Sequence, residues 1–181
     1  MDANRTVGQA NSFGRVAEAY ESARPRYPDA AVDWLLPAGA STVLDIGAGT
    51  GKFTRSLVAR NLDVIAVEPD DVMREILLTS LPTVRALAGT AERLPLPDNS
   101  VDAVTLAQAW HWVDQPAATA EIARVLRPGG TLGLVWKIRD ETVPWVKKRG
   151  DVMGRSDAER FIKGPLKIQA PFQPFTSFEV D

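Results

Sequence analysis

The sequence predicts an α/β fold in which a doubly wound, largely parallel sheet carries helices on both of its faces. Short apolar segments alternate along the chain with segments whose apolar residues recur at helical spacing. The short segments are apolar throughout, as expected for parallel strands that are covered by helices on each side. A length of 181 residues with 45% hydrophobic residues suits one packed domain.

Strands and helices can be placed from this alternation. A helix is expected after Asp29, a second from Lys52, a third with Asp70 as its N-cap, and a fourth from Gln115 that stops at Pro128. The predicted strands lie between and around these helices, at residues 43–46, 63–69, 83–89, 101–108 and 131–136.

The two ends of the chain give weaker signals. Apolar spacing predicts a short helix at residues 13–20 and a helical piece near residues 143–152. Residues 154–160 form a polar patch without a predicted element, and residues 178–180 have the character of a strand that has just begun.

Composition excludes several classes of function. The net charge of −2 comes from 21 basic and 23 acidic side chains without long runs of either sign, so no nucleic-acid partner or anionic membrane surface is expected. With no cysteine and one histidine, disulfides, thiol chemistry and the usual metal clusters are not expected. No apolar leader or membrane span is evident, and we expect a cytoplasmic protein.

A glycine-rich string between the first strand and its helix is the strongest local signal. Asp45 is followed by Gly47, Gly49 and Gly51 in the pattern D-x-G-x-G-x-G. Glycines at these positions remove each Cβ that would keep a ligand away from the backbone of the turn. In open α/β sheets, ligands bind at this edge, beyond the carboxyl ends of the strands.

The spacing separates three kinds of nucleotide loop. A Walker-type phosphate loop is excluded because Ile46 and Phe53 occupy positions that this motif reserves for glycine and for serine or threonine. The match to the dinucleotide-binding fingerprint is weakened because Lys52 stands in place of its third glycine. The D-x-G-x-G-x-G pattern remains, with a purely structural turn as the alternative.

Glu68 ends the second strand, and the parallel sheet places this carboxylate beside the glycine turn. A carboxylate at this position accepts two hydrogen bonds from the diol of a ribose, as it does in dinucleotide-binding folds. A solvated acid at a strand end is the alternative. We interpret Glu68 as a ribose-binding residue because it follows the glycine string in the expected order.

Residues 41–136 resemble the methyltransferase domain of class I S-adenosylmethionine-dependent enzymes, which has a Rossmann-like fold. Asp45 to Gly51 match the first motif of this family, and Glu68 matches its ribose-binding acid. Residues 89–104 match the loop on the adenine side and the fourth strand, and residues 124–136 match the following helix, Pro-Gly-Gly turn and fifth strand. The resemblance implies S-adenosylmethionine as cofactor and a small-molecule methyl acceptor.

The loop on the adenine side departs from the family pattern. Many relatives carry aspartate where this chain has Thr90, and that acid accepts a hydrogen bond from the adenine amino group. Thr90 accepts only through a neutral hydroxyl, so Ala91 and Glu92 are candidates to complete adenine binding.

Two further segments resemble a trans-aconitate-type subgroup that acts on small acids. Residues 13–28 resemble its N-terminal lid, with Tyr20 as a candidate cofactor-covering residue and Arg24 as a candidate to orient an acidic substrate. Residues 107–114 resemble the subgroup's segment after the fourth strand, with Gln108 on the cofactor side and His111 as a candidate base. Simple packing of these aromatic and histidine side chains is the alternative.

The resemblance divides the chain into four parts: a disordered tail at 1–11, an N-terminal helical lid at 12–40, an S-adenosylmethionine-binding core at 41–137 and a C-terminal segment at 138–181. Class I methyltransferases have two more strands than the five read here, so a truncated chain and a shortened variant both stay open. The predicted function is methyl transfer to a small molecule with a carboxylate or hydroxyl acceptor, by a monomer or homodimer. A nicotinamide-dependent oxidoreductase and a non-catalytic binding module are the alternatives.

Overall fold

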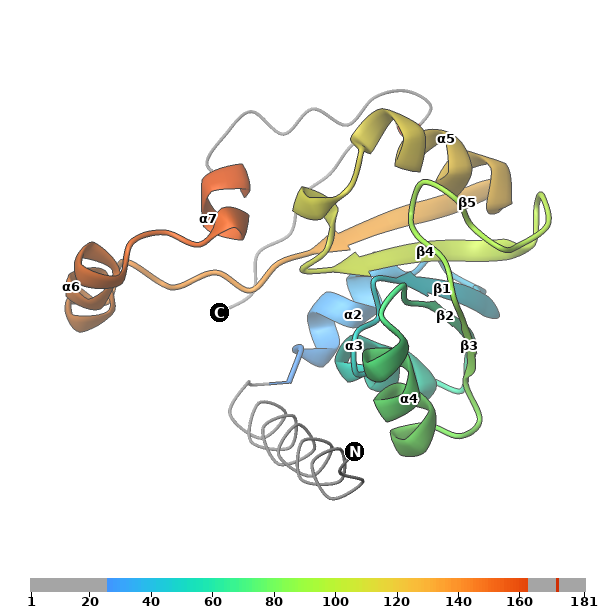
Figure 1. The fold of residues 1–181 in the computed structure, drawn as a ribbon, viewed down its shortest axis with the longest axis horizontal. Coiled ribbons are helices and arrows are strands. Elements are labelled where there is room, and N and C mark those ends of the chain that lie inside the picture. The colour runs from blue at the N-terminus through green and yellow to red at the C-terminus, as the bar shows by residue number, and fades with distance from the viewer. Residues whose placement is uncertain (1–25, 163–171, 173–181) are drawn as a thin grey trace, which may run out of the picture.

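The structure, a computed structural model, describes residues 26–162 and residue 172. Its centre is a five-stranded sheet with strand order β3-β2-β1-β4-β5, in which every neighbouring pair is parallel (Figure 1). The strands are β1 (Thr42–Ile46), β2 (Asp63–Val67), β3 (Arg85–Leu87), β4 (Val101–Ala107) and β5 (Leu126–Val135). This confirms the predicted α/β class and the parallel sheet.

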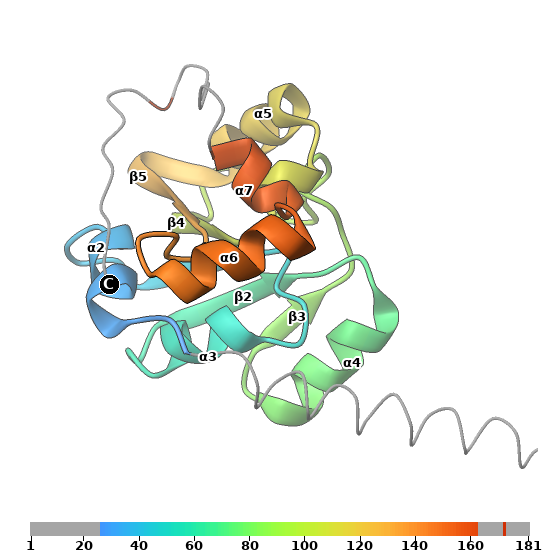
Figure 2. The ribbon, with the colours of Figure 1, turned by 90° about the vertical axis from the view of Figure 1, so that its left-hand side faces the viewer.

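Helices connect β1 to β2, β2 to β3 and β4 to β5, and they cover both faces of the sheet (Figures 1 and 2). On one face lie α2 (Asp29–Leu35), α3 (Lys52–Val58) and α4 (Asp71–Ser80), and on the other lies α5 (Gln115–Val125). Beyond the carboxyl ends of the strands follow α6 (Pro144–Met153) and α7 (Asp157–Ile162), and a short 3-10 turn, η1 (Trp110–Trp112), follows β4.

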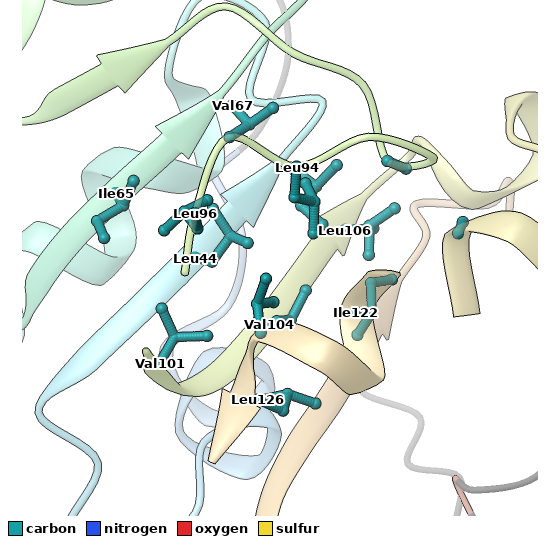
Figure 3. Packing of buried hydrophobic residues seen from close by; sticks show 14 of the residues in the cluster. Leu44, Ile65, Val67, Leu94, Leu96, Val101, Val104, Leu106, Ile122 and Leu126 are labelled. Atoms are coloured by element: carbon teal, nitrogen blue, oxygen red, sulfur yellow. The ribbon is translucent and has the colours of Figure 1, made fainter. Parts of the chain in front are cut away.

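The sheet packs against two layers of apolar side chains because successive residues of each strand point to opposite faces. On the α5 side, side chains from β1, β2 and β4 meet α5 and the loop between β3 and β4 (Figure 3). On the other side, Val43 and Val64 meet α2 and α3, while Ala66 meets α4. The three inner strands β1, β2 and β4 are therefore buried on both faces, as their apolar composition predicts.

The four helices predicted after Asp29, from Lys52, after Asp70 and from Gln115 are confirmed, whereas the helix predicted at residues 13–20 lies outside the described residues. The Asp70 carboxylate accepts a hydrogen bond from the Met73 backbone N–H at 2.9 Å and caps α4. The Asp114 carboxylate accepts one from the Ala117 N–H at 3.1 Å and caps α5, with Pro116 in the first turn. Both caps satisfy N–H groups that have no partner inside the helix.

One boundary predicted for the C-terminal part is corrected by the structure. The fourth helix was expected to run to Pro128, but α5 ends at Val125 and β5 begins at Leu126. Leu126 pairs with Val101, and the register then shifts before Thr131 pairs with Ala103, so the Pro-Gly-Gly segment is an irregular part of the strand. In addition, the polar patch at residues 154–160 contains the start of α7.

The order of the strands creates a switch point between β1 and β4. From β1 the chain moves to β2 and β3 on one side, and then returns to β4 and β5 on the other. At such a point the connections leave in opposite directions and open a crevice at the carboxyl ends of the strands. The glycine string follows β1 and the segment around Gln108 follows β4, so both lie at this edge.

The helix α4 supports the glycine string, and this role predicts a clear difference between two neighbouring leucines. Leu77 is fully buried beside Gly51, whereas Leu78 is 40% exposed on the same helix. We expect Leu77→Ala to lower the free energy of unfolding by about 2–5 kcal/mol, because it leaves a cavity in a packed core. Leu78→Ala is the matched control, with an effect of about 0.5 kcal/mol. Equal effects in urea denaturation would contradict this packing.

Candidate functional site

The glycine string forms a tight loop between β1 and α3. Gly47, Gly49 and Gly51 all have positive φ angles, of 66°, 56° and 87°. The Gly47 N–H donates to the Val67 carbonyl at 2.8 Å, which fixes the loop to the end of β2. The loop therefore has a backbone conformation that favours glycine at each of these positions.

The three glycines differ in what surrounds them. A Cβ at Gly47 would lie 2.9 Å from the Ala109 Cβ, and a Cβ at Gly51 would lie 2.9 Å from the Leu77 Cγ. At Gly49 the nearest neighbour would be the Met73 Sδ at 3.9 Å. Gly47 and Gly51 thus permit close packing of the protein on itself, while the Cβ side of Gly49 is free of such close contacts.

Glu68 is buried where the loops after β1 and β2 meet, with 6% of its surface exposed. One carboxylate oxygen accepts a hydrogen bond from the Gly49 N–H at 2.8 Å, and the other accepts one from the Asp70 N–H at 3.0 Å. A buried carboxylate requires such partners, because desolvation would otherwise be very costly. Glu68 therefore links the glycine loop to the start of α4.

Asp45 lies inside the sheet beneath the glycine loop and is fully buried. The Thr54 hydroxyl donates to one of its oxygens at 2.6 Å, and the Thr105 hydroxyl lies 3.3 Å from the other. Burial raises the pKa of Asp45 to about 7, against the opposing effect of these two hydroxyls. Asp45 joins β1, α3 and β4, and it is placed to hold the loop rather than to touch a ligand.

The Thr105 hydroxyl lies between two acceptor oxygens. The Thr105 hydroxyl lies 3.3 Å from the Leu44 carbonyl as well as 3.3 Å from Asp45. A hydroxyl has one proton to donate, and both of these oxygens would be acceptors if Asp45 were ionised. The Thr105 hydroxyl proton is therefore shared between the Asp45 carboxylate and the Leu44 carbonyl.

The loop after β3 reaches the same edge of the sheet, beside Glu68. The Glu68 N–H donates to the Leu87 carbonyl at 3.1 Å, so the loop begins next to the acid. Within it, Thr90 is exposed, Ala91 is buried, and the Glu92 carboxylate accepts from the Asp114 N–H at 2.8 Å. The structure thus places all three predicted adenine-side residues at one end of the sheet.

The rest of this loop is held by an ion pair on α5. The Arg124 guanidinium donates to the Leu94 carbonyl at 3.1 Å and to the Leu96 carbonyl at 2.8 Å. The Glu121 carboxylate pairs with Arg124 at 2.8 Å and accepts from the Leu94 N–H at 2.9 Å. The loop is therefore fixed to α5 through its own backbone.

Gln108 follows β4 on the other side of the switch point. It has a positive φ of 60°, and its side-chain amide donates to the Lys137 carbonyl at 3.1 Å. The amide thus ties the segment after β4 to the end of β5.

Tyr27, in the segment that precedes α2, lies near the same edge. Its ring is buried against Phe53 with the ring centroids 4.9 Å apart, and the Lys137 ammonium lies 3.6 Å from the centre of the Tyr27 ring. The predicted lid residues Tyr20 and Arg24 lie outside the described residues.

His111 lies in η1, between buried Trp110 and exposed Trp112. Its Nδ1 accepts a hydrogen bond from the Trp136 indole N–H at 3.4 Å. Partial burial lowers the pKa of His111, and the negative charge of Asp157 partly opposes this. The imidazole is therefore neutral at physiological pH.

Sequence reasoning missed several residues at this edge because they take part through tertiary contacts. Ala109 packs on Gly47, and Met73 lies nearest to the open side of Gly49. Trp136 and Lys137, at the end of β5, contact His111 and Tyr27. Their positions after predicted strands indicated the correct edge, but no local pattern indicated their partners.

The described residues suit an organic ligand at this edge better than a metal ion. The open backbone of Gly49 and the carboxylate of Glu68 suit a nucleoside, since a carboxylate with two oxygens has lone pairs for hydroxyl groups besides its two N–H partners. Within residues 26–162 and 172 there is no group of three or more acids or histidines that could hold a metal ion. Nor does that part contain a helix long and apolar enough to cross a membrane.

Comparisons with known proteins agree on one family. Residues 44–134 match the methyltransferase domain family. Proteins of Mycobacterium bovis and Mycobacterium tuberculosis, both described as uncharacterized methyltransferases, are 60% identical to this chain over 170 residues, which is 94% of this chain and 69% of theirs. A malonyl-[acyl-carrier protein] O-methyltransferase of Serratia marcescens is 31% identical over 92% of this chain and 66% of its own length.

Solved structures give the same result. A protein of Anabaena variabilis, described as a candidate methyltransferase from an antibiotic biosynthesis pathway, superposes with a TM-score of 0.60 at 35% identity. The match covers 74% of this chain and 54% of the Anabaena chain. This chain therefore spans about half the length of that protein.

The buried position of Asp45 predicts a pH dependence of stability. Because the pKa of Asp45 is raised to about 7 in the folded protein, the folded state binds this proton more tightly than the unfolded state does. Its contribution is fully present below pH 4 and is lost as the pH rises towards 7, a change on the order of 4 kcal/mol. We expect the free energy of unfolding of Asp45→Asn, measured by urea denaturation, to lack this decline.

The matched control is Asp63→Asn, which changes an exposed aspartate at the opposite end of the neighbouring strand. This variant should keep the decline of the wild-type protein. A decline of equal size in Asp45→Asn and in the wild type would show that another group is responsible.

Proposed function

The chain belongs to the family of class I S-adenosylmethionine-dependent methyltransferases, and from this we propose that it binds S-adenosylmethionine at the carboxyl ends of β1 and β2 and methylates a small organic molecule. The observation that carries the proposal is the contact between Glu68 and the Gly49 N–H, beside the switch point of the sheet. It brings a buried acid and an open backbone together where such sheets bind ligands.

We assign the parts of the cofactor to residues by their chemistry. The Glu68 carboxylate would accept hydrogen bonds from the ribose hydroxyls, and the Gly49 backbone would lie against the adenosyl group. Thr90, Ala91 and Glu92 would contact the adenine, and Gln108 would lie on the far side of the crevice. Asp45 would act as a positioning residue below the loop.

The cofactor supplies an activated methyl group on a sulfonium. The residues of the chain therefore have to exclude water and to align the acceptor with the methyl carbon, since little other chemistry is required of the protein. Tyr27 and Phe53 support this edge by packing under the segment that precedes α2. The division into a lid at 12–40, a core at 41–137 and a C-terminal segment at 138–181 stays a proposal, as do the lid roles of Tyr20 and Arg24.

An oxygen acceptor is our proposal for the substrate. The Serratia relative is named as an O-methyltransferase of malonyl-[acyl-carrier protein], which supports transfer to oxygen in this branch of the family. The resemblance of residues 107–114 to the trans-aconitate-type subgroup supports the same acceptor atom. A monomer or homodimer remains our prediction for the assembly.

Binding of S-adenosylhomocysteine tests the cofactor assignment directly. At 100 times its dissociation constant, a ligand of the folded state adds about 2.7 kcal/mol of stability, which corresponds to about 5–10 °C in melting temperature for a chain of this size. We expect this shift with S-adenosylhomocysteine and none with NAD in a thermal-shift assay. The reverse result would favour an oxidoreductase.

Glu68→Ala tests the residue on which the assignment rests. Hydrogen bonds to a charged group contribute roughly 1.5–3 kcal/mol, so calorimetry should show an affinity for S-adenosylhomocysteine about ten- to a hundredfold lower. Glu75→Ala removes an exposed acid from α4 and is the matched control, with unchanged affinity expected. If Glu68→Ala also bound normally, Glu68 would only link the two loops.

A further inference from the structure

The contact between His111 and Trp136 determines which ring nitrogen of His111 carries the proton. The Trp136 indole N–H donates to the Nδ1 atom of His111 at 3.4 Å. An indole nitrogen is a donor only, so Nδ1 must offer a lone pair. In a neutral imidazole, one nitrogen is an acceptor and the other a donor, and the proton therefore lies on Nε2.

We infer that His111 acts as a hydrogen-bond donor towards the methyl acceptor through Nε2–H, and that it is not a general base. A base would have to take a proton at Nε2, which already carries one, while Nδ1 is occupied by Trp136. Among the described residues no hydrogen-bond partner is found for Nε2, so this donor is available to a ligand. This inference rests on the proposed methyltransferase function.

The side chains around His111 hold Trp136 in place and favour the neutral imidazole. Trp136 is held by Phe161 of α7, with the two rings stacked at 5.9 Å, and Phe161 lies 6.4 Å from the His111 ring. The charged groups that α7 brings near are Asp157, which would favour an imidazolium, and Arg160, which pairs with Asp157 at 2.8 Å. Partial burial outweighs Asp157, and the pKa of His111 lies below its ordinary value.

The donor role indicates the chemical class of the acceptor. Without a base, the acceptor atom must be nucleophilic before transfer, and a carboxylate oxygen meets this condition. The oxygen lone pair forms the new bond to the methyl carbon, the carbon–sulfur bond breaks with its electron pair left on sulfur, and no proton is released. The Nε2–H group of His111 would hold the second carboxylate oxygen and align the first.

The proton position can be read without any substrate, because His111 is the single histidine of the chain. In protein labelled with ¹⁵N-histidine, long-range ¹H–¹⁵N correlation spectra distinguish the two neutral forms at pH 7.5. We expect the protonated nitrogen to correlate with both carbon-bound ring protons, which identifies Nε2. A proton on Nδ1 would overturn the inference.

A Trp136 variant tests whether the indole N–H determines which nitrogen of His111 carries the proton. Trp136→Phe keeps a ring against Phe161 but removes the indole N–H, so we expect a mixture of the two neutral forms and a higher titration midpoint for His111. Trp145→Phe changes an exposed tryptophan of α6 and is the matched control, with the wild-type spectrum expected. If Trp136→Phe left the neutral form and the titration midpoint of His111 unchanged, Trp136 would not determine the position of the proton.

Methyl-transfer activities of two His111 variants distinguish a hydrogen-bond donor from a general base. The amide of His111→Gln replaces the donor but cannot act as a base, whereas His111→Ala provides neither. With labelled S-adenosylmethionine and a mixture of small mono-, di- and tricarboxylic acids, we expect His111→Ala to lower the rate roughly ten- to a hundredfold and His111→Gln to restore most of it. The rate should not fall as the pH falls through the titration of His111.

The product identifies the acceptor class. A methyl ester releases volatile labelled methanol in alkali, while a methyl ether or methylamine does not, so we expect the label to be alkali-labile. If His111→Ala and His111→Gln lost methyl-transfer activity equally, and the methyl group were transferred to phenols or amines, the donor role would be wrong. If no transfer occurred although the spectra gave Nε2–H, the proposed function would be wrong and the proton position would still be correct.

Discussion

The close contact between the glycine loop and its neighbours is the constraint on which the rest of this edge depends. The loop is confined by Ala109 from the end of β4 and by Leu77 from α4, each at a distance that leaves no space for a side chain. It is also bonded to the end of β2 through the Val67 carbonyl. Three separate elements are therefore held at fixed positions around one short piece of backbone.

Two carboxylates act on this loop from opposite sides. Asp45 lies below it in a fully buried position, where burial raises its pKa and its two threonine neighbours provide hydrogen bonds. Glu68 lies above it and accepts from the backbone N–H groups of Gly49 and Asp70. Asp45 supports the fold under the loop, while Glu68 links the loop to the start of α4.

Sequence reasoning succeeded where the signal is local and failed where it depends on distant partners. A few consecutive residues were enough to predict the glycine turn and the Asp70 N-cap. The end of the second predicted strand gave the position of Glu68. By contrast, α7 is supported by a pair between Arg139 and the buried Glu159 at 2.6 Å, and this pair cannot be read from residues 154–160. The contact of Trp136 with His111 likewise requires β4 and β5 to be in register.

The cation–π contact between Lys137 and Tyr27 links segments that lie more than half the chain apart. Contacts of such large sequence separation carry a cost in loop-closure entropy, which is paid before the contact contributes to stability. During synthesis, Tyr27 leaves the ribosome long before Lys137 does, so it meets Phe53 first and its cation only after β5 has joined the sheet. The segment before α2 therefore acquires this support only when the end of β5 is in place.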